Sequence, residues 1–421
     1  MSPGQNFRST VESLTSIGSG ELSGPGGSPI FRGSATVGER LAADALTERL
    51  STGGRRVQRH PFTGHSSFGA RFLVHVAVVI AATTLIPFAP GAALAATVVA
   101  ALSLLLEQSR QVRVLSRLLP TAPSQNLQAH PHPPSQSGAR PTIVLCAHYD
   151  TQRTGWCMSD FVQRYSELTW FLPAALRVPF VPETLAILAQ VVLASVAVVR
   201  PLSPVGWGIL VIIAVTHVVC LVMLANWACG RFVPGAADNA TGVAGVLLLA
   251  ERWQAEPVDG VDLMVLLTGC EETGMLGAAA WASANRHLRE RCAFLNLDGL
   301  GFGPPHYLLA EVPVVGLPRR YDGRMLALTG TVASRLEKPA TAIALPGPTD
   351  GLALLTKGFR GLTVVGCQPT GRLPFWHQPG DTPDHVDFGH AQDSLEFGWL
   401  LLRAMADHLN GEIKACRSSS K

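Results

Sequence analysis

The sequence predicts an α/β protein in which a mostly parallel, mixed central sheet carries helices on both faces and two helical hairpins are inserted into the fold. Two observations predict this arrangement. From residue 141 onward, short apolar runs alternate with amphipathic segments, as strands alternate with crossover helices in a parallel sheet. Apolar stretches within residues 72–106 and 178–230 interrupt that pattern, and their length and composition are typical of membrane helices.

The alternation indicates where each element of the sheet domain lies. Strands are expected at 142–147, 262–269, 292–297 and 361–367, and helices at 242–254, 275–287, 321–337 and 394–410. Further upstream, apolar residues recur at helical spacing within residues 35–54, and residues 55–62 resemble an edge strand.

Other segments are expected to be irregular. Residues 1–34 are rich in Gly, Ser and Pro and predict an irregular lead-in. Residues 120–141 read as a Pro/Ser-rich connector, in which His130 and His132 stand beside prolines and are expected in a solvated loop rather than at a metal. Residues 412–421 form a tail. The α/β domain is thereby divided among residues 35–71, 107–177 and 231–411.

Each apolar stretch is expected to form two short membrane helices. Residues 72–106 contain no Asp, Glu, Lys or Arg, and one helix of that length would be about 50 Å long, well beyond a hydrocarbon core of about 30 Å. The sequence "PFAPG" breaks the first stretch, and "RPLSP" separates residues 184–199 from 205–228. Buried core helices are the alternative interpretation, because some of these runs are short for a membrane span.

Both hairpins leave and return on the same side of the membrane. The opposite turns carry only Arg200. The side that holds the α/β domain has six arginines close to the membrane ends: Arg71, Arg110, Arg113, Arg117, Arg177 and Arg231. By the positive-inside rule, the α/β domain of this multi-pass protein is expected in the cytoplasm. Eight cysteines without a C-x-x-C pair agree with a reducing compartment, and the N-terminus does not resemble a secretory signal. The membrane helices would contact bilayer lipid and offer a surface for homo-oligomerisation.

Composition argues against a nucleic-acid partner. The formal net charge is only +3 over 421 residues, and no basic run with interleaved aromatic residues is present.

Acidic and histidine side chains gather where the predicted strands end. They occupy the carboxyl ends of strands or the loops beside them: His148, Asp150, Asp238, Glu271, Glu272, Asp298, His377 and Asp381. Each one alone has an ordinary explanation, such as a helix cap for Asp238 or a turn for Asp298. Gathered at one edge of a sheet, the carboxylates would repel one another unless a cation lay among them.

This set of side chains suits zinc. Imidazole nitrogen and carboxylate oxygen are zinc ligands, and the set is large enough for two ions if one carboxylate bridges them. Two metal ions lower the pKa of a water molecule held between them, and a glutamate that binds neither ion can then act as general base. In the H-x-D spacing, the carboxylate can accept the imidazole N–H and orient the ring.

Five motifs resemble, in their order along the chain, the co-catalytic zinc exopeptidases of the aminopeptidase Y and leucyl-aminopeptidase type. They are "AHYDT", "PGAADNATGVAG", "GCEETGMLGA", "NLDGLG" and "HQPGDT". Glutamate carboxypeptidase, glutaminyl cyclase and the multi-pass endoplasmic-reticulum metallopeptidase are relatives of that family. The resemblance implies the family's phosphorylase/hydrolase-like fold and two Zn²⁺ ions. It places His148 and Asp298 at one ion, Glu272 and His377 at the other, and Asp238 as the ligand that bridges both.

The resemblance also implies roles beyond metal binding. Glu271 would be the general base and Asp150 would orient His148. Asp381 and Asp350 are weaker candidates for supporting a ligand or contacting substrate. Asp350 is weak because "PTDGLALL" (348–355) resembles the family's Ser-Asp-His stretch but lacks its third residue. The chain departs from the family in its two inserted hairpins and in Gln378, where relatives often carry Thr.

The function that these features predict is a membrane-anchored aminopeptidase that cleaves N-terminal peptide bonds with a metal-bridged hydroxide. Two alternatives stay open. One is a single-zinc, glutaminyl cyclase-like acyltransferase, and the other is a catalytically idle membrane receptor or scaffold that retains the fold. All five ligand positions and the base are filled, which favours the two-metal enzyme. "GLGFG" (299–303) is expected to be a turn rather than a nucleotide loop, and Cys270 a buried bystander.

Overall fold

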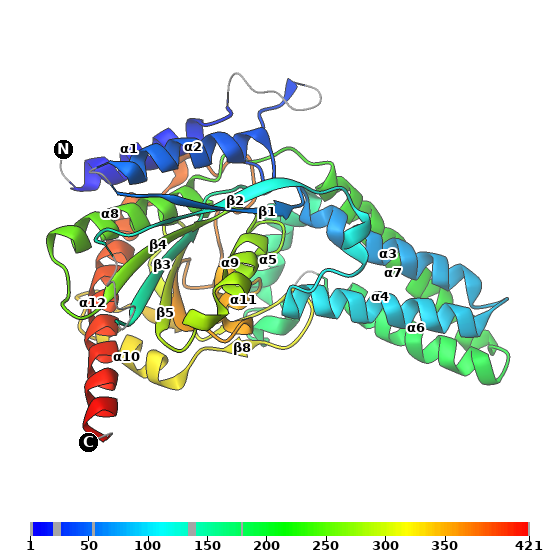
Figure 1. Ribbon diagram of the computed structural model, residues 1–421. Coiled ribbons are helices and arrows are strands. Elements are labelled where there is room, and N and C mark those ends of the chain that lie inside the picture. The colour runs from blue at the N-terminus through cyan, green and yellow to red at the C-terminus, as the bar shows by residue number, and fades with distance from the viewer. Residues whose placement is uncertain (1–2, 20–26, 53–54, 134–139, 178–179, 420–421) are drawn as a thin grey trace.

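The computed structural model describes residues 3–19, 27–52, 55–133, 140–177 and 180–419. Its centre is a twisted eight-stranded sheet in the order β1-β2-β4-β3-β5-β10-β6-β9 (Figure 1). Strands β4, β3, β5 and β10 run parallel, while β1, β2 and β6 join antiparallel neighbours. The bounds are β1 Gln58–Gly64, β2 Ala122–Ala129, β3 Thr142–His148, β4 Asp262–Thr268, β5 Cys292–Asp298, β6 Pro305–Leu308, β9 Thr341–Ile343 and β10 Arg360–Gly366. A small ribbon pairs β7 (Ala310–Glu311) with β8 (Arg319–Arg320).

Helices cover both faces of the sheet, as the alternating pattern predicted. Helix α8 (Thr241–Ala255) packs on β3, β4 and β5, and α12 (Phe388–Ser419) packs beside it on β10 and β6. Helices α1 (Pro3–Ser16) and α2 (Val37–Ser51) pack against α8 and β2, respectively. The opposite face carries α9 (Leu276–Ala284) and α11 (Asp350–Thr356), while α10 (Gly323–Ala333) lies beside α12 and β9. The predicted fold class is therefore confirmed.

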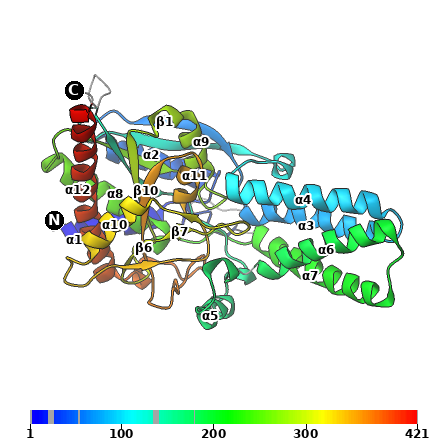
Figure 2. The same cartoon turned by 90° about the horizontal axis from the view of Figure 1, so that it is seen from below.

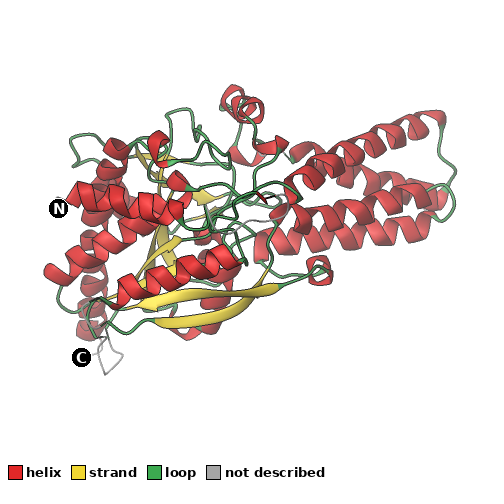
Figure 3. Ribbon diagram, turned by 90° about the horizontal axis from the view of Figure 1, so that it is seen from above, coloured by secondary structure: helices red, strands yellow, loops and turns green. Residues whose placement is uncertain are grey.

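Four long helices form a bundle that projects away from the sheet domain (Figures 1 and 3). They are α3 (Phe68–Leu85), α4 (Pro90–Arg110), α6 (Val181–Val199) and α7 (Pro204–Ala228). Helix α3 packs on α4 and α7, and α6 packs on the same two helices. All four are long and apolar enough to cross a membrane. The short helix α5 (Asp160–Leu168) lies near the base of the bundle (Figure 2).

The bundle exposes apolar side chains and encloses a buried polar cluster within its mainly apolar interior. Its outward side chains include exposed Val192, Val211 and Ile212. At the centre, the buried Gln190 side chain donates to Thr97 Oγ1 at 2.9 Å and faces His217 Nε2 at 2.9 Å. An apolar exterior with a hydrogen-bonded interior is typical of helices that pack in lipid.

Three predicted irregular segments are ordered in part. Residues 3–16 of the lead-in form helix α1, because Phe7, Val11 and Leu14 recur at helical spacing and are buried, whereas residues 20–26 lie outside the described residues. The connector contains strand β2, whose Leu127 is buried against α2. The closing helix extends through the predicted tail to Ser419, and residues 420–421 are not described.

Candidate metal centre

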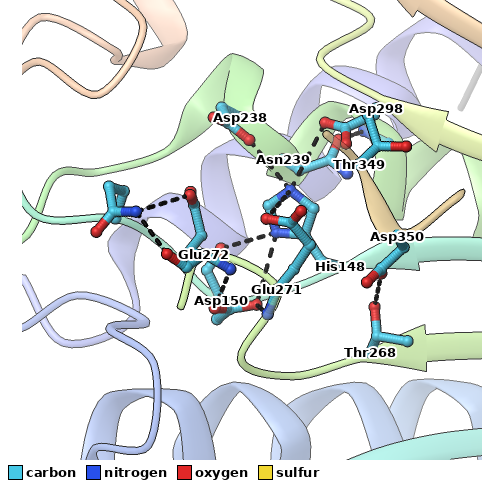
Figure 4. Close-up of polar contacts among 12 residues, drawn as sticks. His148, Asp150, Asp238, Asn239, Thr268, Glu271, Glu272, Asp298, Thr349 and Asp350 are labelled. Carbon is cyan, nitrogen blue, oxygen red and sulfur yellow. Dashed lines mark hydrogen bonds and ion pairs between the residues drawn. The ribbon is translucent and has the colours of Figure 1, made fainter. Parts of the chain in front are cut away.

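The predicted ligands converge at the carboxyl edge of the sheet (Figure 4). His148 is the last residue of β3, and Asp298 is the last residue of the neighbouring strand β5. Glu271 and Glu272 follow β4, which flanks β3 on its other side. Parallel strands end at one edge of a sheet, so residues about 120 and 150 positions apart in the chain meet there.

Two histidine rings face opposite ends of one carboxylate. His148 Nε2 lies 3.1 Å from Asp238 Oδ1, and His377 Nε2 lies 3.1 Å from Asp238 Oδ2. Asp298 Oδ1 is 3.6 Å from the first imidazole, and Glu272 Oε2 is 3.1 Å from the second. The structure therefore brings the five predicted ligands together as two groups that share Asp238.

The loop that carries Asp238 is held by Asp381. Ala237 N donates to Asp381 Oδ1 at 2.7 Å, and Asp238 N donates to Asp381 Oδ2 at 3.1 Å. Asn239 adds a hydrogen bond from its amide to the Leu297 carbonyl at 3.0 Å, and its Oδ1 accepts from Gly299 N at 3.1 Å. This network connects the Asp238 loop to the end of β5, so Asp238 and Asp298 are held together.

Asp150 fixes the backbone of the glutamate pair. Its Oδ1 accepts from Glu271 N at 3.0 Å, and its Oδ2 accepts from Glu272 N at 3.2 Å. The Asp150 carboxylate lies 3.6 Å from His148 Nδ1, beyond hydrogen-bond distance, and Nδ1 instead faces the Asp150 carbonyl at 3.3 Å. Asp150 thus positions the two glutamates more directly than it orients the imidazole.

Burial and mutual repulsion shift the pKa values of these groups. Burial raises the pKa of Glu271 well above its ordinary value and that of Glu272 to about 7. Burial opposes protonation of His377, but Glu272 and Asp238 outweigh it and raise the pKa of that imidazole to about 9. These shifts are expected where several buried carboxylates lie close together, because burial penalises each charge and the charges repel one another.

The donor set fits divalent zinc. The side-chain atoms of His148, Asp238 and Glu272 lie within 4.8 Å of one another, close enough for a single ion. Glu272 Oε1 and His377 Nδ1 are buried and accept or donate no hydrogen bond within the described part of the chain. A buried carboxylate oxygen without a partner is costly unless a ligand satisfies it. Imidazole and carboxylate together match the ligand preference of zinc.

A cavity opens directly at this cluster. It holds about 880 Å³ of space, part of it open to solvent. Glu271 and Glu272 line it together with both histidines, and apolar side chains from the base of the bundle, Phe68 and Trp227 among them, form part of its wall. The Glu271 carboxylate lies 4.0 Å from His148 Nε2. A substrate bound at the metal centre would therefore contact Glu271 within a cavity that is lined mainly by apolar side chains.

Two candidate residues lie away from this cavity. Asp350 is buried at the start of α11, where it accepts a short hydrogen bond from Thr268 Oγ1, and it does not line the cavity (Figure 4). Asp381 likewise acts on the Asp238 loop rather than on the cavity.

Cys270 is buried, and burial raises the pKa of its thiol well above the usual range. His130 lies near the Leu263 carbonyl at the start of β4, which is the edge of the sheet opposite the metal centre.

Several supporting residues were not identified from the sequence. Arg32 is fully buried and donates to the backbone carbonyls of Tyr149, Leu14, Pro234 and Gly235. Ser34 Oγ donates to Asp150 Oδ2 at 2.6 Å. These residues come from the segment predicted to be an irregular lead-in, where no pattern marks a buried cation.

Glu39 and Gln152 support the loop of residues 269–275 between β4 and α9, which carries Glu271 and Glu272 and is called the glutamate loop below. Glu39 Oε1 accepts from Cys270 N at 2.8 Å, and burial raises the pKa of Glu39 to about 8. Gln152 Nε2 donates to the Glu272 carbonyl at 2.6 Å. The available signal was weak: Gln152 follows the "AHYDT" motif at once, and Glu39 is an acidic residue on a helix face that also carries buried Ala42 and Leu46.

Comparison with known proteins bears on the family and the fold of this chain. The model of peptidase family M28 matches residues 217–400, which include Asp238, Glu271, Glu272, Asp298 and His377. A search of the curated proteins found no match. The family match confirms the resemblance to zinc exopeptidases that the motifs predicted.

Solved structures share the fold at low sequence identity. A zinc aminopeptidase from Bacillus subtilis is similar with a TM-score of 0.53 and 12% identity, over 95% of this chain and 94% of that chain. An aminopeptidase from Aneurinibacillus sp. strain AM-1 gives 0.52 and 14%, over 95% and 93%. A glutaminyl cyclase from Porphyromonas gingivalis gives 0.52 and 13%, over 96% and 98%. At these identities the likeness concerns the fold alone.

Proposed function

We propose that this chain, whose residues 217–400 match peptidase family M28, is a membrane-anchored aminopeptidase that uses two zinc ions. One observation carries the proposal. The two oxygens of Asp238 each lie 3.1 Å from a different imidazole, and this supports the proposal that Asp238 would be a ligand shared by two ions. His148 and Asp298 would complete one ligand group, and His377 and Glu272 the other.

The residues of the chain then divide the work of hydrolysis. Zinc, when bound, lowers the pKa of water and polarises a carbonyl group. Glu271, at the cavity wall, takes the proton from the attacking water and gives it to the departing amine. Asp150 accepts hydrogen bonds from the backbone amides of Glu271 and Glu272. These bonds fix the position of the proposed base, Glu271, relative to the proposed metal ligand, Glu272. Asp381 performs the same task for Asp238.

Hydrolysis of aminoacyl p-nitroanilides tests the activity. The zinc-loaded protein in detergent should release nitroaniline from at least one member of a panel that varies the side chain. A chelator should abolish the release, and added zinc should restore it. The panel includes an N-terminal glutaminyl peptide, because a glutaminyl cyclase shares the fold. Cyclisation of that peptide without hydrolysis of any other member would favour the cyclase. Absence of any reaction with all members of the panel would favour a scaffold.

We further propose that the four-helix bundle spans a lipid bilayer with the α/β domain on the cytoplasmic side. Exposed valine, leucine and isoleucine side chains cover the bundle, and a soluble protein rarely exposes so continuous an apolar surface. Arg200 caps the C-terminal end of α6, which is the end of that helix that points away from the sheet domain (Figure 1). Carbonate washing should leave the protein in the membrane fraction. Release without detergent would contradict membrane anchoring.

Cysteine labelling tests the orientation. In a Cys416→Ser background, Arg200→Cys should react with a membrane-impermeant maleimide added outside intact cells. Cys229, exposed at the base of α7, is the matched control and should react only after the membrane is opened. The opposite labelling pattern would reverse the orientation.

A further inference from the structure

The cavity at the metal centre continues into a second chamber. The two spaces share walls made by Met158, Trp227, Leu345 and Trp376. The indole of Trp376 stacks on the imidazole of His377, with 3.8 Å between ring centroids. The chamber therefore begins one side chain away from a candidate metal ligand, and a substrate held at the metal centre can extend into it.

The chamber is apolar and lies at the base of the helix bundle. Phe180, just before α6, and Trp227, near the end of α7, form part of its wall. Two cationic side chains, Arg177 and Arg372, interrupt the apolar surface. Arg372 is already neutralised, because its nitrogens lie 3.6 Å from Asp160 and 4.0 Å from Glu167.

Arg177 has a different environment. The residue is only 4% exposed, its guanidinium stacks on Trp170, and Nη2 donates to the Ala344 carbonyl at 2.6 Å. Its Nε and Nη1 atoms are buried and find no hydrogen-bond partner among the described residues. Burial lowers the pKa of this guanidinium, and no charged group within the described chain offsets that effect. Such a cation retains unused hydrogen-bonding capacity, which a negatively charged ligand would satisfy.

We propose that the chamber receives the C-terminal end of a short apolar peptide and that Arg177 binds its terminal carboxylate. The assignment rests on the proposed aminopeptidase function, in which the free amine and the scissile bond lie at the metal centre. The residues after that bond then lie along the apolar wall. A short peptide ends in a carboxylate within this space, whereas a long polypeptide presents neutral amides there. Short peptides with apolar side chains are thus the preferred substrate class.

Binding to a non-hydrolysing protein tests the assignment. Zinc-loaded Glu271→Gln protein in detergent is titrated with Leu-Leu, with Leu-Leu-amide and with laurate. Leu-Leu should bind about 10- to 100-fold more tightly than its amide, as expected for a hydrogen bond to a charged group. Arg177→Met, added to the first substitution, should abolish that difference, Arg177→Lys should restore part of it, and the paired Arg372→Met should leave it intact.

The kinetic comparison needs no variant at position 177. Wild-type enzyme should show the same preference for Leu-Leu over Leu-Leu-amide in kcat/KM. Equal hydrolysis of the acid and the amide would refute the role of Arg177 while leaving the peptidase function in place. Absence of all hydrolysis, with Leu-Leu still bound in an Arg177-dependent manner, would refute the peptidase function instead. Arg177-dependent binding of laurate but not of Leu-Leu would overturn the proposal, because the carboxylate would then come from a fatty acid.

Discussion

A buried ion pair links the helix bundle to the glutamate loop, and its removal has a calculable consequence. Arg71, in the first turn of α3, lies 3.1 Å from Glu107 of α4, and the two side chains are 2% and 1% exposed. The same guanidinium donates a short hydrogen bond to the carbonyl of Thr273, the residue after Glu272. Arg71 therefore holds two helices and the loop of the metal centre at once.

We predict that Arg71→Met destabilises the protein by about 3–5 kcal/mol, the cost of leaving one member of a buried ion pair without its partner. Glu107 would keep its hydrogen bonds from Val114 N and Ser116 N but lose its cationic partner. The glutamate loop would lose a donor to Thr273, so kcat should fall as well. The double variant Arg71→Met/Glu107→Gln removes both charges and should be more stable than the single variant.

Chemical unfolding in detergent, followed by tryptophan fluorescence, measures the loss of free energy. Arg110→Met is the matched control, because Arg110 is exposed at the end of the same helix as Glu107, and its stability should equal that of the wild type. An Arg71→Met protein as stable and as active as the wild type would refute the reasoning. A double variant less stable than the single variant would refute the role of the charge pair.

Further predictions follow from individual sites. His377→Ala should lower the zinc content by one ion per chain, as measured by elemental analysis, while retention of both ions would contradict its assignment. Burial raises the pKa of Glu311 to about 7, so the native state binds its proton more tightly than the unfolded state does. This contribution to stability is complete below about pH 4.5 and is lost as the pH rises toward 7. Glu311→Gln should therefore lose less stability than wild type between pH 5 and pH 8 in thermal unfolding, and an unchanged pH profile would exclude this contribution. In native protein, iodoacetamide should modify the exposed Cys229 and spare the buried Cys270, as peptide mass spectrometry would show.

The strand ends of the site were predictable because the relevant signal is local. His148, Glu271 and Asp298 each follow an apolar run, and parallel strands necessarily end at one edge of the sheet. The helices of the bundle were equally visible, since length and lack of charge are properties of the segment itself.

The supporting contacts were not predictable because each joins segments that no local pattern relates. Ser34 and Asp150 are 116 residues apart, and Arg32 and Gly235 are 203 apart. Strand β2 was missed because its polar residues point to specific partners, such as Asn126, whose amide donates to the Gly277 carbonyl at 2.9 Å. Helix α1 was missed because the Gly, Ser and Pro content of the whole lead-in masked the short repeat of Phe7, Val11 and Leu14.

The zinc content and activity of Glu271→Gln protein test the central claim most directly. Wild-type protein should contain two zinc ions per chain and hydrolyse an aminoacyl p-nitroanilide. The variant should keep both ions, because Glu271 is assigned to neither ligand group, and its kcat should fall by about 10²- to 10⁴-fold, the usual contribution of a general base. A variant that binds both ions and hydrolyses the substrate at the wild-type rate would contradict the account, as would a wild-type protein that binds no zinc.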